Sequence, residues 1–461
     1  RQMIDASGAV NISDLFRLVP GFQACQVHAN AFGVVSHGQG DSHPGRLEVM
    51  LDGRSVYLPL LSTVDWSALG IGINDIDYIE VVRGSNVPSQ GSNAFLGAIN
   101  IITREPLQDQ GTTIGTTLGS LTTREHYLRQ NGRLGEIDYR LSVNFHKTHG
   151  TGSGREDGLI SNPELPMEDG GEISQLNFRG TYTPNLIDSI DLQLGISGGQ
   201  FGVGSANHPA DFSPREVDTH FQQLIWTRQL DQGNELKLQA YHNYHRWKNT
   251  DEMLLSEKFG LTPAQVKAAT GFDDELADFG DQDGTTERVD IELEHAINIA
   301  DNKRLIWGVG SRWESLKSAK LIGAGNDVSE FMFRTFGSYE WKPSRQWTFN
   351  TSAMLEHNEL IGTQLSPRLG ANWHLTPNLT LRSSVSQSYR TPSLLEENQF
   401  TTLTLPSNGV VLDLDGYTPG DLDSERIRSY ELGLIHLFPE WRSSIDLKFY
   451  IEDIDNAIGD V

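Results

Sequence analysis

The chain contains little cysteine, few basic residues and no long apolar stretch. One cysteine among 461 residues, Cys25, excludes an intrachain disulfide and a zinc site built on cysteines. The 36 basic against 61 acidic residues give a net charge of −25, which repels phosphate backbones, so we expect no nucleic-acid partner. No apolar run approaches the ~18 residues that a membrane-spanning helix needs. These features exclude a helical membrane protein, but they do not exclude a β-barrel.

Catalytic motifs are missing as well. The sequence has no G-x-S-x-G, no H-E-x-x-H and no phosphate-binding glycine-rich loop. His28, His37 and His43 are loosely spaced on a glycine-rich stretch, which favours polar loop residues over a metal site. We therefore expect neither an enzyme nor a resident metal or cofactor.

The first part of the chain has the pattern of a small α+β domain. Apolar residues at helical spacing predict a helix over residues 11–19, which Pro20 and Gly21 end. Three strand-like runs bounded by glycine turns follow, at residues 47–51, 76–82 and 98–103. We place this domain at residues 1–106.

From residue 107 to residue 461 the pattern changes to alternating segments separated by turns. Ile190, Leu192 and Leu194, for example, alternate with polar residues, as in a strand with one apolar and one polar face. We count about fifteen such strands between Thr112 and Ile458. Alternation alone fits both a soluble sandwich and a transmembrane barrel whose polar face lines the lumen.

Three features favour the barrel. Eight of the nine tryptophans lie after residue 107, often near segment ends, as in the aromatic girdle of a membrane barrel. Tight turns alternate with long loops near residues 150–171, 200–217, 250–284 and 393–425. One of these loops carries a capping box at Thr262, which predicts a short helix ending at Gly271. Because an open sheet leaves unpaired backbone groups in lipid, we expect a closed barrel and a chain that continues beyond residue 461.

Several segments resemble the TonB-dependent outer-membrane receptors. The plug segments are residues 14–22 (DLFRLVPGF), 47–57 (LEVMLDGRSVY) and 75–103 (DIDYIEVVRGSNVPSQGSNAFLGAINIIT). The barrel segments are residues 366–369 (SPRL), 388–397 (SYRTPSLLEE) and 424–434 (SERIRSYELGL). The resemblance implies an all-β transmembrane barrel with a small α+β plug inside its lumen. The family barrel has 22 strands, so about seven strands are expected beyond this chain, as are the signal peptide and TonB box upstream.

The resemblance also implies a function, in the outer membrane of a Gram-negative bacterium. Such a receptor binds an extracellular metal chelate, here expected to be a ferric siderophore, and imports it with energy from TonB, ExbB and ExbD. The other expected contacts are outer-membrane lipid and lipopolysaccharide, and the protein is expected to be a monomer. Cobalamin, haem, nickel complexes and oligosaccharides are alternative cargoes. A passive porin or adhesin, and a soluble β-rich binding protein or carbohydrate-active enzyme, are the alternatives outside active transport.

Two groups of residues are candidates for the site. In the family, plug arginines pair with barrel glutamates, and Arg83 matches one such arginine. Its expected partners are Glu431, with Glu396 or Glu397. The usual arginine before the second plug motif is replaced by His37, which puts a second pair in doubt. The ligand contacts expected on the outward plug loops are Gln39, Asp41, His43, Tyr57 and Trp66.

Overall fold

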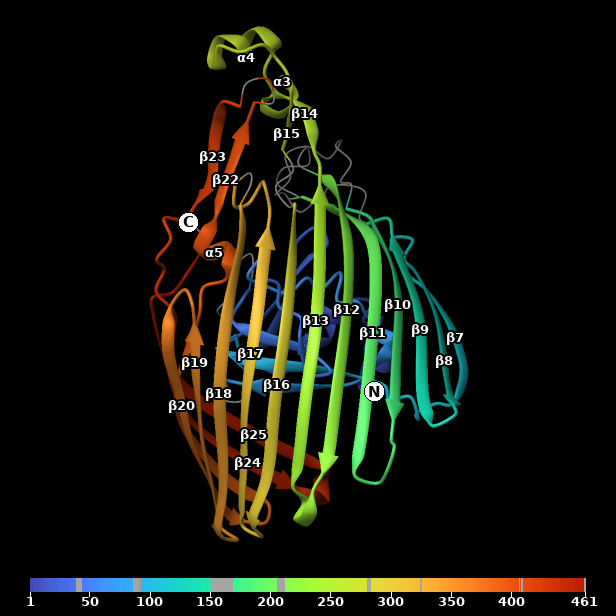
Figure 1. Ribbon diagram of the computed structural model, residues 1–461, viewed down its shortest axis with the longest axis vertical. Coiled ribbons are helices and arrows are strands. Elements are labelled where there is room, and N and C mark those ends of the chain that lie inside the picture. The colour runs from blue at the N-terminus through green and yellow to red at the C-terminus, as the bar shows by residue number, and fades with distance from the viewer. Residues whose placement is uncertain are drawn as a thin grey trace.

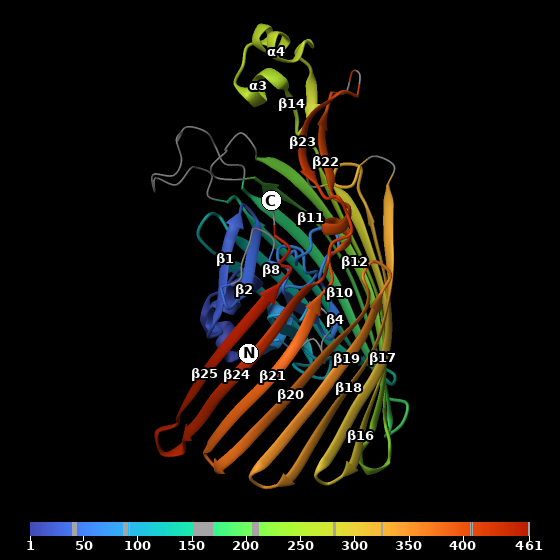
Figure 2. The same ribbon diagram turned by 90° about the vertical axis from the view of Figure 1, so that its left-hand side faces the viewer.

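The computed structural model describes residues 1–38, 44–85, 91, 93–150, 169–204, 212–279, 283–323, 326–405, 407 and 409–459. Its largest element is one antiparallel sheet of 15 strands, which we call the wall, in the order β25-β24-β21-β20-β19-β18-β17-β16-β13-β12-β11-β10-β9-β8-β7. The wall curves around the N-terminal part of the chain (Figures 1 and 2). The wall strands are β7 (Gly111–Leu118), β8 (Arg124–Leu134), β9 (Ile137–Thr148), β10 (Gly171–Tyr182), β11 (Asp188–Val203), β12 (Ser213–Gln229), β13 (Glu235–Asn249), β16 (Gly284–Ala300), β17 (Lys303–Lys317), β18 (Asp327–Ser344), β19 (Trp347–Asn358), β20 (Gly362–Thr376), β21 (Leu379–Arg390), β24 (Glu425–Phe438) and β25 (Ser443–Asp455).

The N-terminal region, residues 1–106, holds a second, smaller sheet. Its four strands have the order β4-β3-β6-β5, and β3 and β6 are parallel. A separate hairpin, β1-β2, lies beside this sheet. The elements of the region are α1 (Gln2–Ser7), η1 (Ile12–Leu18), β1 (Phe22–His28), β2 (Ala31–Ser36), β3 (Leu47–Leu51), β4 (Arg54–Ser55), η2 (Ile73–Asp75), β5 (Ile76–Arg83) and β6 (Gly97–Thr103). The three predicted strands are confirmed, whereas the predicted helix at 11–19 is a 3-10 helix.

The two faces of the wall have opposite chemistry. On β11, Leu192, Leu194 and Ile196 are exposed, while Asp191 and Gln193, which alternate with them, are buried. The same inversion recurs along the other wall strands, because polar side chains point toward the N-terminal region and apolar ones point away from it. An exposed apolar face of this extent is what lipid contact requires, and the polar face is that of a barrel lumen. The predicted fold class and the fifteen strands are confirmed.

The two ends of the wall differ in the length of their connections. At one end the strands are joined by short turns, where Trp347 stacks on Trp373 with ring centroids 5.4 Å apart. Exposed aromatics at this end, including Trp341 and Trp441, form the interfacial group that the tryptophan distribution predicts. Trp247 does not belong to it, because its ring is buried on the inner face.

Two long connections at the other end form one arm (Figures 1 and 2). The first follows β13 and contains the predicted helix; the second follows β21. Leu255, Val266 and Ala277 of the first pack with Leu405 of the second in a small apolar core. The elements are β14 (Glu252–Leu254), α3 (Leu255–Phe259), α4 (Pro263–Thr270), β15 (Leu276–Asp278), α5 (Leu394–Asn398), β22 (Phe400–Thr404) and β23 (Val411–Tyr417); η4 (Asp231–Gly233) and η5 (Pro439–Trp441) lie in short turns. No helix in the described part of the chain is long and apolar enough to cross a membrane.

Candidate functional site

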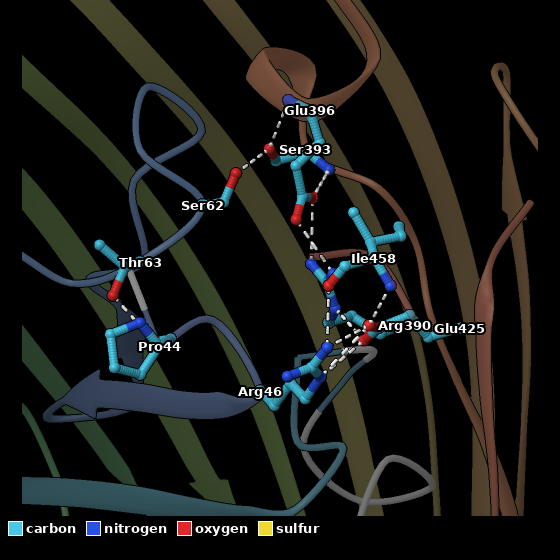
Figure 3. Close-up of polar contacts among 9 residues, drawn as sticks. All are labelled: Pro44, Arg46, Ser62, Thr63, Arg390, Ser393, Glu396, Glu425 and Ile458. Atoms are coloured by element: carbon cyan, nitrogen blue, oxygen red, sulfur yellow. Dashed lines mark hydrogen bonds and ion pairs between the residues drawn. The ribbon is translucent and has the colours of Figure 1, made fainter. Parts of the chain in front are cut away.

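Four alternating charges connect the N-terminal region to the wall (Figure 3). Arg46 donates from Nη2 to Glu425 Oε1 at 2.6 Å and from Nε to Glu425 Oε2 at 3.1 Å. Arg390 donates from Nε to the same carboxylate at 2.5 Å and holds Glu396 with two hydrogen bonds of 3.0 Å. Glu425 is fully buried, and the backbone N–H of Ile458 also donates to it. Each buried charge therefore has an opposite partner, which offsets much of its desolvation cost.

The local sequence fixes each member of this network. Arg46 directly precedes β3, and its carbonyl accepts a hydrogen bond from the N–H of Leu96. Arg390 ends β21 and faces Glu425, the first residue of β24, across the strand pair. Glu396 lies in the first turn of α5, where it and Ser393 form a capping box. The network is thus held by strand ends and a helix cap.

A loop of the N-terminal region touches the same helix cap. The hydroxyl of Ser62 is hydrogen-bonded to that of Ser393 (Figure 3). Thr63 donates to the carbonyl of Pro44 at 2.8 Å, which holds the loop beside the segment leading to Arg46. Glycine is required at position 45, because a Cβ there would overlap the carbonyl oxygen of Ser62.

The structure corrects the expected partners of Arg83. Arg83 pairs with Asp446 of β25 at 3.0 Å, and both side chains remain about one-third exposed. Glu431 instead pairs with Lys448 of the adjacent strand at 2.6 Å. Lys448 also donates to the carbonyl oxygen of Arg83. Lys448 therefore neutralises Glu431, and Arg83 pairs with Asp446 instead.

The other two expected glutamates have partners on the wall side. Glu396 belongs to the network through Arg390, as described above. Glu397 accepts backbone hydrogen bonds from Asp421 and Leu422, so it fixes the connection that leads into β24. Arg83 thus forms an ion pair with the wall as expected, but with Asp446 instead of a glutamate, and the expected Glu396 belongs to a second network built on Arg46.

His37 has a carboxylate partner although it replaces an arginine. Its Nδ1 lies 2.9 Å from both carboxylate oxygens of Glu452 on β25. The ring of Tyr450 stacks on the imidazole with centroids 4.0 Å apart. This contact is a second link between the N-terminal region and the end of the wall.

Of the expected ligand contacts, two can be located. Tyr57 and Trp66 are 5% and 7% exposed and belong to the main apolar core of the N-terminal region. Trp66 packs on Phe16 with ring centroids 5.1 Å apart. Trp66 is therefore enclosed in the core, whereas Tyr57 also lines a small cavity between this region and the wall. Gln39, Asp41 and His43 lie outside the described residues.

A buried carboxylate that sequence reasoning missed anchors the loop after β4. Asp65 accepts a hydrogen bond of 3.1 Å from Nε1 of Trp247, and Nη2 of Arg215 lies 3.7 Å from it. The guanidinium of Arg215 stacks on the Trp247 ring at 3.9 Å, and the imidazole of His245 lies beside the same carboxylate of Asp65. Nothing in the local sequence marks these residues, because three wall positions meet one loop residue only in the folded chain.

The inner face of β16, β17 and β18 carries a dense set of ion pairs. Arg334 binds Asp290 through two hydrogen bonds of 2.8 and 2.9 Å, and Arg312 shares that carboxylate at 2.8 Å. Arg288 pairs with Glu314 at 2.7 Å. Glu48 of β3 faces these arginines, and burial raises the pKa of its carboxyl although Arg312 and Arg288 oppose that shift. No cluster of metal-binding side chains occurs among the described residues.

Comparison with known proteins agrees with this arrangement. The family model for the TonB-dependent receptor plug domain matches residues 1–98, and the model for the TonB-dependent receptor-like β-barrel matches residues 168–461. The siderophore receptor PirA of Acinetobacter baumannii has the same fold, with a TM-score of 0.73, 16% identity, and coverage of 98% of this chain and 69% of that one.

Curated relatives extend the likeness to the sequence. The vitamin B12 transporter BtuB of Vibrio cholerae is 23% identical over 432 residues, which are 94% of this chain and 64% of the relative. The iron-regulated outer membrane virulence protein of the same species is 23% identical over 331 residues, 70% of this chain and 45% of the relative. The chain thus spans less than two thirds of the length of either relative. With both family models matched, the chain belongs to the TonB-dependent receptors of the outer membrane, and its N-terminal region and wall are their plug and barrel.

Proposed function

We propose that the whole protein actively imports a ferric siderophore across the outer membrane. The observation that carries this proposal is the plug, which is folded against the polar face of the barrel and held there by the Arg46–Glu425–Arg390–Glu396 network. A passive porin needs an unobstructed lumen, whereas an active transporter needs a barrier that an energy source can move. TonB, energised by ExbB and ExbD, would supply that energy from the periplasm.

The siderophore assignment is supported by the structural neighbours. PirA, which shares the fold across 98% of this chain, is named a siderophore receptor. The iron-regulated outer membrane virulence protein adds a relative whose name links it to iron. Cobalamin is the second candidate cargo, because the relative that covers 94% of this chain is a vitamin B12 transporter.

The exposed apolar face of the barrel would contact outer-membrane lipid, and its long-loop end would meet lipopolysaccharide. The apolar face is continuous along the wall strands, and its short-turn end carries the stacked pair Trp347 and Trp373. We propose that the protein works as a monomer, because each receptor contains its own plug and needs no second copy to close its lumen.

Uptake by cells tests the proposal. A strain that lacks the gene would be given ⁵⁵Fe-loaded catecholate and hydroxamate siderophores, and ⁵⁷Co-cobalamin in parallel. The proposal predicts that the strain fails to take up one of the iron chelates and that complementation restores this uptake. It also predicts that the uptake requires TonB. A defect in cobalamin uptake alone would replace the siderophore with the second cargo. Uptake that persists without TonB would contradict active transport.

A further inference from the structure

Arg54 is a buried cation for which the described part of the chain supplies no carboxylate. It lies on β4, is 3% exposed, and takes part in no ion pair among the described residues. Nη1 donates to Oδ1 of Asn243 at 2.7 Å, and the Phe221 ring covers the guanidinium at 3.8 Å. Its Nε and Nη2 atoms are buried and have no hydrogen-bond partner. A buried guanidinium with two unpaired N–H groups is costly, so this arrangement calls for an acceptor in contact with them.

The nearby carboxylates are already engaged. Both oxygens of Asp52 accept hydrogen bonds from Thr103, at 2.9 Å from its N–H and 2.6 Å from its hydroxyl. Asp65 accepts hydrogen bonds from Ser67 at one oxygen and from Trp247 at the other. Glu314 is paired with Arg288 and lies close to Arg312. None of these carboxylates forms an ion pair or a hydrogen bond with Arg54, although the charge of Asp52 still acts on it from a distance.

A cavity borders the unpartnered guanidinium. It lies between the plug loop that follows β4 and the barrel strands β12, β13 and β16, and its volume is about 40 Å³. Its lining includes Arg54, Phe221, Asn243 and His245. On the scale of roughly 10–15 Å³ for each buried water, this space holds about three waters, or one monatomic ion with a water. This volume suits a monatomic ion better than a tetrahedral phosphate or sulfate.

We propose that this cavity binds one small inorganic anion of the halide class, held by Arg54 where the plug meets the barrel wall. The ion would accept hydrogen bonds from Nε and Nη2 and would place a negative charge in direct contact with the guanidinium. Burial lowers the pKa of Arg54 only to about 10, so the guanidinium keeps its proton at neutral pH. The bound ion would then fix the plug loop against β12 and β13. Nothing in this proposal depends on which cargo the receptor carries.

Bromide is the probe for the test. Crystals of the full receptor in detergent would be soaked in sodium bromide and measured at the bromine absorption edge. The proposal predicts an anomalous peak in the cavity within hydrogen-bond distance of the Arg54 guanidinium. A cavity without such a peak, filled by water alone, would overturn the proposal.

Thermal unfolding provides an independent readout. At equal ionic strength, sodium bromide should raise the Tm above its value in sodium gluconate, and the rise should saturate with concentration. At 100 times the Kd, the ratio of folded to unfolded protein rises about 100-fold. Arg54→Met should abolish this difference, while Arg17→Met, at an exposed plug arginine, should retain it. Equal Tm values in both salts for the wild type, or an unchanged bromide effect in Arg54→Met, would contradict the proposal, and the crystal measurement needs no variant.

Discussion

Arg46 of the plug and Glu425 of β24 form a bidentate ion pair that joins the two parts of the receptor, with 2.6 Å between Nη2 and Oε1. Arg390 shares the same carboxylate from the barrel side. Glu425 therefore binds one arginine of the plug and one arginine of the barrel.

Glu425→Gln should destabilise the receptor strongly. The substitution keeps the shape of the side chain but removes the buried negative charge that Arg46 and Arg390 share, and breaking a buried ion pair in this way costs about 3–5 kcal/mol. Asp446→Asn is the matched control, since its ion pairs with Arg83 and Arg382 are partly exposed and should each contribute less than about 1 kcal/mol. Guanidinium unfolding of the two variants in detergent measures the difference. Equal losses of stability would show that the buried network has no special role.

Asp65→Ala should loosen the plug loop that follows β4. The change removes the acceptor of the Trp247 indole N–H and leaves that buried donor unsatisfied, which we expect to cost about 1–3 kcal/mol. Hydrogen exchange should accelerate over residues 56–69, and the Trp247 fluorescence should change. Asp14→Ala, at an exposed pair with Arg17, is the control. Unchanged exchange in the loop would contradict an anchoring role.

Glu48→Gln should be more stable than the wild type, increasingly so as the pH rises. Burial raises the pKa of Glu48 in the folded state, so folding takes up a proton. The stability that Glu48 contributes is complete below its unfolded-state pKa of about 4.3 and is lost as pH rises through the folded-state pKa. The difference between variant and wild type should grow by up to about 1.4 kcal/mol per pH unit over that window and then level off.

Unfolding curves from pH 4 upward would measure this window. Glu80→Gln removes an exposed carboxylate from β5 of the same sheet and controls for the loss of one negative charge. A difference between Glu48→Gln and wild type that stays constant with pH would show that Glu48 does not titrate in the folded receptor.

Leu405→Ala should separate the two long loops of the arm. Leu405 is fully buried against Leu255 and Val266 of the other loop, and truncating a buried leucine costs about 2–5 kcal/mol. We expect faster hydrogen exchange over residues 255–279, which are distant in sequence from the substitution. Val411→Ala, at a half-exposed position on β23, should leave that exchange unchanged. The same rate in both variants would mean that the loops behave independently.

Much of the fold could be predicted because membrane barrels repeat one local rule. Apolar residues that alternate with polar ones, such as Leu192, Leu194 and Ile196, indicate the two faces of a strand, and turn residues indicate where the strand ends. The capping box at Thr262 also predicted its helix correctly, since Thr262 accepts the hydrogen bond from the Gln265 N–H. Trp247 departs from the girdle pattern because it shares the inward-facing parity of β13 with Tyr241 and His245, and its indole N–H there donates to Asp65 of the plug.

The site was harder to predict because its contacts join residues far apart in the chain. The motif segments contained Arg390, Glu396 and Glu425, but no local pattern distinguished Arg46 from Arg83 as the plug partner. That choice depends on Lys448, which pairs with Glu431 and is visible only once β24 and β25 lie side by side. Tyr57 and Trp66 were expected at a ligand surface on their chemistry, and the apolar core of the plug buries them instead.

The central claim is that the plug is held at the network around Arg46 and must move there for import. Ser62 of the plug and Ser393 of the barrel have touching hydroxyls, so Ser62→Cys with Ser393→Cys places two thiols where a disulfide can form. The exposed Cys25 would first be changed to serine. Uptake of ⁵⁵Fe-siderophore by cells carrying this double variant is the most direct measurement. Import that stops under oxidation and returns with reductant is the predicted result, and full import with the disulfide closed would contradict the account.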